Sequence, residues 1–253
     1  HNPFVKTPDT IGTEQRTQEA NKAPKNKQLQ KENFVAMVEY MDKIVGRIVK
    51  KVQSIGQEEN TIILFTADNG TNRGITSRWN GLDIKGGKGG MKDMGTHVPL
   101  VAAWPGRSPT GVVCNDLVDF TDMYPTFADA AGVSIGKDDP VDGCSFLPQL
   151  SGENGETRDF VFLHYQPYWG AQPGQFARTQ EYKLYRNGGL FHVPEDLEES
   201  SDLNLINYLD QSGNEAKKLL SEVLSKAPPA PTEPGSRTTV ERPTYADWPL
   251  LNH

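Results

Sequence analysis

Cysteine is nearly absent from this chain of 253 residues, which contains only Cys114 and Cys144. Two cysteines are too few for a disulfide-stabilised scaffold, and their separation matches no metal-binding spacing. A single bridge and two buried thiols both remain open interpretations. The scarcity therefore excludes a small disulfide-rich fold and a cysteine-based metal site.

The chain also lacks long apolar runs and an excess of positive charge. No run reaches the roughly 18 apolar residues of a membrane-spanning helix, so the sequence predicts no transmembrane span. The formal net charge of -7 argues against a general nucleic-acid binder, which would present a basic surface. It still permits a small cationic pocket for an anionic substrate. With 36% hydrophobic residues, we expect one large domain, or one domain with a smaller partner.

An initiator methionine and a signal peptide are missing as well. The chain opens directly with His1-Asn2-Pro3-Phe4. This start predicts an upstream segment of the same protein, which would hold any targeting signal.

Helical and strand patterns alternate in the first part of the chain. Residues 3–32 are polar and predict a surface loop. From Asn33, the predicted N-cap, apolar residues recur at steps of three and four, which predicts an amphipathic helix ending before Gly56. Residues 61–66 (TIILFT) are typical of a buried parallel strand, and residues 99–104 (PLVAAW) form a second apolar run. This order predicts an α/β sheet flanked by helices.

The later part of the chain has shorter elements. Residues 119–131 predict a short helix that ends at Gly132. The pieces FVFLH, YKLYR and GLFHV are strand-like, and the Gly-Asn turns between them predict antiparallel pairing. A helix over residues 214–226 and a proline-rich, extended tail from Ala227 complete the chain.

Asp68 and Asn69 follow the predicted strand directly, in TADNG. Ligand sites of α/β sheets lie beyond the carboxyl ends of the strands, and a carboxylate beside an amide carbonyl suits Ca²⁺ or Mg²⁺. A polar surface turn is one alternative, and glycosylation at Asn69-Gly70-Thr71 is another. An asparagine at a buried metal could not carry a glycan, so the metal and the glycan exclude one another.

Lys88 has two glycines on either side, in GGKGG. The segment is not a Walker A loop, because Gly89 stands where Ser or Thr would follow the lysine. Glycines let the backbone approach an anion closely while the ammonium supplies a point charge; a solvated loop lysine is the alternative. His1 is a candidate general acid, with a terminal histidine of no function as the alternative, and we interpret His97 and His164 as structural.

The order of these motifs resembles the sulfatase family. The matching segments are HNPF, EYMDKIVGRIV, NTIILFTADNGT, GGKGG with GTHVPLVAAWPG, DLVDFTDMYPTFADAAG and DGCSFLPQLSG. The resemblance implies a sulfatase/alkaline-phosphatase-like sheet flanked by helices, with residues 1–152 forming the C-terminal part of the catalytic domain. It further implies a smaller C-terminal α+β subdomain with an antiparallel sheet over residues 153–226, and an extended tail over residues 227–253.

The resemblance also implies roles for single residues. Asp68 and Asn69 match the pair that ligates a divalent cation, usually Ca²⁺, with Mg²⁺ as the alternative. Lys88 and His1 match the lysine and histidine that contact the sulfate, and His1 is then the candidate proton donor to the leaving alcohol. A metal and Lys88 would together neutralise the sulfate oxygens. The implied activity is hydrolysis of a sulfate ester, in a family whose members are exported (periplasmic or secreted) or lysosomal.

Two departures from the family pattern are informative. The Cys/Ser-x-Pro-x-Arg motif that yields the formylglycine nucleophile is absent around both cysteines, as are the paired N-terminal aspartates of the metal shell. We therefore expect the C-terminal half to two-thirds of a sulfatase, inactive without its N-terminal segment. His97 also replaces the family's arginine, which weakens any expectation of an ion pair there.

The expected partner is a sulfated small molecule or glycan. The aromatic side chains of HYQPYW could line a sugar site, although packing of the small sheet against the main domain is the favoured interpretation; they are His164, Tyr165, Tyr168 and Trp169. Two other functions remain open: a phosphodiester or phosphonate hydrolase of the alkaline-phosphatase superfamily, and a non-catalytic degenerate sulfatase or sugar-binding remnant.

Overall fold

The structure is a computed structural model and describes residues 4–11, 24–168, 171–205 and 209–233. By its internal contacts the chain divides into two compact units, residues 1–107 and residues 108–253. The predicted boundary after residue 152 stays a prediction.

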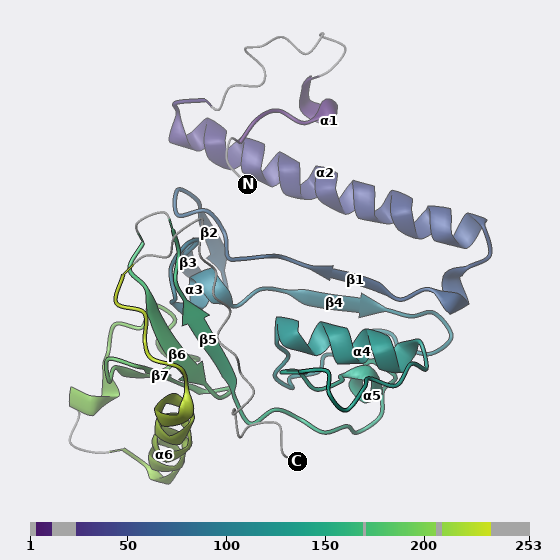
Figure 1. The fold of residues 1–253 in the computed structure, drawn as a ribbon. Helices are drawn as coiled ribbons and strands as arrows, with labels where there is room; N and C mark the ends of the chain where they lie inside the picture. The colour runs from purple at the N-terminus through teal and green to yellow at the C-terminus, as the bar shows by residue number, and fades with distance from the viewer. Residues whose placement is uncertain (1–3, 12–23, 169–170, 206–208, 234–253) are drawn as a thin grey trace. The chain divides into compact units, whose positions relative to one another are not determined.

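Helix α2 (Lys27–Ser54) is the longest element of the first unit and follows the short helix α1 (Pro8–Ile11) (Figure 1). Its N-cap is Asn26, whose side chain accepts hydrogen bonds from two backbone N–H groups of the first turn. The prediction of Asn33 as the cap was wrong, and so was the prediction of a loop up to residue 32. The first turns are rich in Lys, Gln and Glu, which form helices well without an apolar face.

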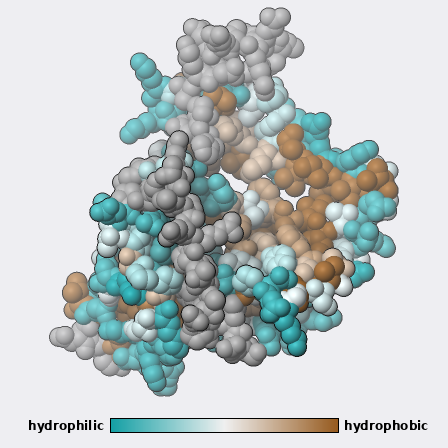
Figure 2. All heavy atoms as spheres, in the orientation of Figure 1, coloured by the Kyte–Doolittle hydropathy of each residue, from teal (hydrophilic) through white to brown (hydrophobic). Residues whose placement is uncertain are grey.

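The apolar stripe of α2 is largely open to solvent among the described residues. None of its side chains is buried, and Leu29, Met41 and Ile48 are 42–53% exposed. Figure 2 shows apolar atoms along this helix. Buried Phe4 packs edge-to-face on Phe34, with ring centroids 5.6 Å apart.

Strands β1 (Ile63–Thr66) and β4 (Leu100–Ala103) form at the two predicted apolar runs, and they pair antiparallel. The predicted parallel direction was therefore wrong, because an apolar run indicates a strand but carries no information on its direction. The chain from β1 to β4 forms a β-hairpin of β2 (Thr76–Trp79) and β3 (Leu82–Lys85), followed by the short helix α3 (Asp93–Thr96).

The second unit begins with helical segments. The predicted helix over residues 119–131 forms as η2 (Phe120–Asp122) followed by α4 (Met123–Ala130). It ends, as predicted, at Gly132, which has a φ of +67°. The short helix α5 (Leu147–Leu150) follows.

An antiparallel four-stranded sheet carries the main core of this unit. Its order is β5-β6-β7-β8, formed by β5 (Val161–Tyr165), β6 (Gly174–Arg178), β7 (Tyr182–Tyr185) and β8 (Leu190–His192). The predicted antiparallel pairing is confirmed, but β6 was missed. The 3-10 turn η3 (Leu203–Leu205) precedes α6 (Gln211–Lys226), whose apolar residues, including Leu220 and Val223, pack on β6 and β7.

None of the helices in the described ranges is both long and apolar enough to cross a membrane.

Candidate functional site

The TADNG turn and the GGKGG loop lie side by side in the first unit, although about twenty residues separate Asp68 from Lys88. One backbone hydrogen bond joins the two segments directly, and one more joins each of them to α3. The Lys88 N–H donates to the Thr71 carbonyl at 2.9 Å, the Gly70 N–H to the Gly95 carbonyl at 2.9 Å, and the Gly87 N–H to the Met94 carbonyl at 3.2 Å. The fold therefore brings two of the motifs of the predicted site into direct contact.

Glycine is required here because backbone packs on backbone. A Cβ at Gly70 would lie 1.9 Å from the Met94 carbonyl oxygen, and one at Gly86 would lie 2.3 Å from the Asn72 carbonyl oxygen. No side chain fits at such distances without a backbone shift. The glycines of GGKGG thus hold the loop against its neighbours, which is a stronger constraint than flexibility alone.

The polar side chains of the two motifs differ in exposure. Asp68 is exposed, while Asn69 and Lys88 are half-buried. The Asn69 amide nitrogen donates to the Gly70 carbonyl at 3.2 Å, and the Arg73 guanidinium donates to the Lys88 carbonyl at 2.8 Å. Within the described ranges no carboxylate forms an ion pair with Lys88. The remaining predicted residue, His1, lies outside the described residues.

The donors fit a divalent cation only in part. Asp68 offers carboxylate oxygens, and Asn69 offers an amide oxygen because its nitrogen faces Gly70. Calcium takes about 6–8 oxygen ligands. Across the described residues, no group of three or more His, Cys, Asp and Glu side chains could hold a metal. The turn therefore supplies part of a hard-oxygen donor set.

The segment after the loop contains an unexpected pair. Asp93 is buried, and its carboxylate lies 3.0 Å from Nδ1 of His97, whose side chain is 68% exposed. Histidine stands at position 97, where the family pattern has arginine. Its ring still contacts the Asp93 carboxylate one helical turn before it. This contact lies within the α3 segment, and the backbone bonds from the Gly87 and Gly70 N–H groups to α3 hold that segment beside the glycine loop.

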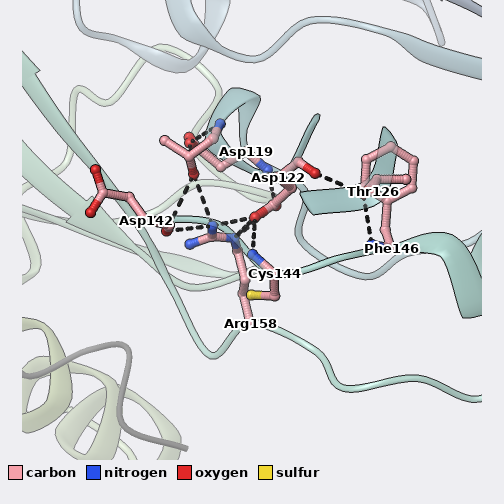
Figure 3. Close-up of polar contacts among 8 residues, drawn as sticks. Asp119, Asp122, Thr126, Asp142, Cys144, Phe146 and Arg158 are labelled. Atoms are coloured by element: carbon pink, nitrogen blue, oxygen red, sulfur yellow. Dashed lines mark hydrogen bonds and ion pairs between the residues drawn. The ribbon is translucent and has the colours of Figure 1, made fainter. Parts of the chain in front are cut away.

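A second polar cluster surrounds Asp122 in the second unit (Figure 3). This buried carboxylate accepts hydrogen bonds from the Arg158 guanidinium and from the backbone N–H groups of Asp119 and Cys144. Its own carbonyl accepts from the Thr126 hydroxyl at 2.7 Å. Protein groups occupy the carboxylate from several sides, so this cluster joins η2 to the chain before β5 and is structural.

The cysteines fit neither open interpretation. Both are free, Cys114 is exposed and Cys144 is half-buried, so they form neither a bridge nor a pair of buried thiols. Burial raises the pKa of the Cys144 thiol, which keeps it protonated at neutral pH. Neither position suggests a nucleophile.

The buried charges of the second unit were not predicted from the sequence. Besides Asp122 and Arg158, Lys183 on β7 pairs with Glu199 at 3.0 Å, and both side chains are almost completely buried. The only available signal was a lysine inside an apolar strand pattern, YKLY. Of the proposed aromatic wall, Tyr168 is exposed and Trp169 lies outside the described residues.

Comparisons with known proteins agree with this fold and motif order. The family model described as Sulfatase matches residues 1–133, and the model described as N-sulphoglucosamine sulphohydrolase, C-terminal, matches residues 87–225. The fold and the matched family models together define a mixed α/β protein of the sulfatase fold. This chain belongs to the sulfatase family.

Individual relatives cover the chain only in part. It is 39% identical over 140 residues to the uncharacterised sulfatase YdeN of Escherichia coli, a match that covers 54% of this chain and 25% of that protein. It is 30% identical over 168 residues to an ulvan-active sulfatase of Formosa agariphila, covering 63% and 29%. The chain thus spans about a quarter of the length of these relatives.

A solved structure supports the fold. A protein in complex with its substrate D-glucosamine-2-N,6-O-disulfate superposes with a TM-score of 0.63, at 24% identity, covering 76% of this chain and 40% of the other. At this identity the likeness concerns the fold alone.

Proposed function

We propose that this chain is part of a sulfuric-ester hydrolase, in which Lys88 contacts the sulfate of the substrate. The single observation that supports this most is the direct packing of the GGKGG loop on the segment that follows Asp68 and Asn69. Family membership supplies the reaction class, and the spatial contact supplies a reason for the spacing of the motifs.

Lys88 has the properties that a sulfate contact needs. Its backbone is fixed on both sides, by the N–H bond to Thr71 and by the bond from Arg73 to its carbonyl. The side chain is half-buried and, among the described residues, not neutralised by a carboxylate. A fixed cation beside a dianionic transition state stabilises charge more than one that must be reorganised.

Asp68 and Asn69 would contribute oxygen ligands to a divalent cation, with Ca²⁺ proposed and Mg²⁺ as the alternative. Such an ion would neutralise sulfate oxygens during the reaction. His1 is proposed as the proton donor to the leaving alcohol. The nucleophile is assigned to no residue of this chain, and the activity is proposed for the whole protein to which the chain belongs.

The proposed substrate is a sulfated carbohydrate. Support comes from the relative named as an ulvan-active sulfatase and from the match to the N-sulphoglucosamine sulphohydrolase C-terminal model. An exported or lysosomal compartment is part of the same proposal and rests on the family alone.

The test is turnover of p-nitrophenyl sulfate by the full-length protein in the presence of Ca²⁺. Lys88→Ala should lower kcat by about 100-fold or more, the usual effect of removing one transition-state contact. Lys50→Ala, an exposed lysine on α2, is the matched control and should retain the wild-type rate. Full activity of Lys88→Ala would show that the lysine has another role.

A further inference from the structure

An exposed tryptophan lies at the tip of the β-hairpin that connects the TADNG turn to the GGKGG loop. The hairpin of β2 and β3 pairs Thr76 with Lys85 and Trp79 with Leu82. Its turn is Asn80-Gly81, with φ values of +48° and +81°, as a type I′ turn requires. Trp79 is 61% exposed and Leu82 opposite it is 55% exposed.

The base of this hairpin is fixed to the site. Ile75 is 1% exposed, its carbonyl accepts from the Gly86 N–H at 2.9 Å, and its N–H donates to the Asn72 carbonyl at 3.0 Å. A two-stranded hairpin alone is marginally stable in water, so these contacts determine its position. The hairpin is therefore a fixed arm between the Asp68-Asn69 turn and Lys88.

The two faces of the arm differ in chemistry. Side chains alternate along a strand, so Trp79 and Leu82 share one face with half-buried Ile84, while Arg78 and Asp83 lie on the other. Arg78 and Asp83 form an exposed ion pair at 3.5 Å. An aromatic and an aliphatic side chain thus form a small apolar platform without a partner in the described part of the chain.

The surrounding charge favours an anionic ligand. Residues 68–93 contain five basic and three acidic side chains, a net charge of +2, whereas the whole chain has a net charge of -7. The basic residues are Arg73, Arg78, Lys85, Lys88 and Lys92, and the acidic ones are Asp68, Asp83 and Asp93. A local cationic segment in an acidic protein concentrates anionic ligands.

We propose that the β2–β3 hairpin is a carbohydrate-binding arm, on which Trp79 stacks against a sugar ring of a sulfated oligosaccharide whose terminal sulfate lies at Lys88. This inference rests on the proposed function. Four residues per strand give the arm a length of about 13 Å from base to tip. The ligand is therefore an oligosaccharide, because a single sulfated ring bound at Lys88 would not reach the platform.

The test measures binding and turnover separately in the full-length protein. Binding of a heparin tetrasaccharide and of its desulfated counterpart is followed by calorimetry, and turnover is measured on the tetrasaccharide and on p-nitrophenyl sulfate. Trp79→Ala should weaken tetrasaccharide binding about 10-fold, and should lower kcat/KM for the tetrasaccharide relative to that for p-nitrophenyl sulfate by a similar factor. Trp79→Phe should restore most of the binding. Tyr124→Ala, which removes a side chain 56% exposed on α4, is the control.

The outcomes separate this inference from the proposed function. If Trp79→Ala turns over substrate and binds the tetrasaccharide as tightly as wild type, the hairpin is not a carbohydrate-binding arm, and the proposed sulfatase activity still stands. Binding that depends on Trp79 in a protein without turnover supports the arm and overturns the proposed reaction. If wild type binds the desulfated tetrasaccharide as tightly as the sulfated one, the proposed role of the cationic segment in binding is wrong. A marked loss of thermal stability in Trp79→Ala also overturns the inference, because it would place Trp79 in a packed contact.

Discussion

The buried ion pair of the second unit offers the sharpest test of how this structure is stabilised. Lys183 Nζ lies 3.0 Å from Glu199 Oε1, with side-chain exposures of 0% and 1%. The Tyr185 hydroxyl donates to the other Glu199 oxygen, and the ammonium also lies 4.0 Å from the centroid of the Phe176 ring. We expect Lys183→Met to destabilise this sheet strongly, because a carboxylate would remain buried after its cation is removed.

The magnitude follows from the geometry. Two unit charges 3.0 Å apart attract by roughly 5 kcal/mol at an effective dielectric constant of about 20. Removing one partner of a buried pair costs about 3–5 kcal/mol, so we expect the free energy of unfolding to fall by about that amount, with the Coulomb value at the upper end. The double variant Lys183→Met/Glu199→Leu should recover most of this loss, because it removes the buried charge together with its cation.

The assay is urea denaturation of the full-length protein, followed by circular dichroism for wild type, both single variants and the double variant. Lys226→Met is the matched control, because Lys226 pairs with Glu222 on the exposed side of α6. Surface pairs contribute about 0–1 kcal/mol, so this control should be close to wild type. If Lys183→Met costs no more than Lys226→Met, the reasoning about burial is refuted.

Two further predictions concern pH and packing. Burial lowers the pKa of His164 below its ordinary value of 6.5, and its Nδ1 accepts from Gln175 Nε2, which also donates to the Pro228 carbonyl at 2.8 Å. The unfolded chain then binds the proton more readily, so the stabilisation is complete above pH 6.5 and is lost as the pH falls through the lower, folded value. His164→Asn should therefore show a smaller drop in urea midpoint between pH 7 and pH 5 than wild type, and an equal drop would contradict this assignment. In the site, Gly86→Ala should lower turnover of p-nitrophenyl sulfate, because the new Cβ would lie 2.3 Å from the Asn72 carbonyl oxygen and displace the Lys88 loop. Gly46→Ala in α2, where nothing lies within 4 Å, should instead raise stability by about 0.5–1 kcal/mol without loss of rate; similar behaviour of the two variants would show that the loop tolerates displacement.

Patterns that repeat locally were readable from the sequence. The helical period of α2, the apolar runs of β1 and β4, and the short strand-like pieces of the second unit are all patterns among near neighbours in the chain. The family was readable from motif order, since TADNG, GGKGG and DGCSFLPQLSG are specific in combination. The hairpin at residues 76–85 was missed although its Asn-Gly turn is a strong local signal.

Other features depend on contacts between distant residues. The direction of β4 relative to β1, the burial of Lys183 beside Glu199, and the Arg158–Asp122 pair join segments whose spacing carries no periodic signal. The roles of Lys88, Asp68, Asn69 and His1 remain predictions from the family motifs. For GGKGG, the sequence by itself showed a lysine between glycines and, together with the other motifs, the family. Only the tertiary structure decided why the glycines are needed: the loop lies so close to the chain after Asn69 that a Cβ would collide with a carbonyl oxygen.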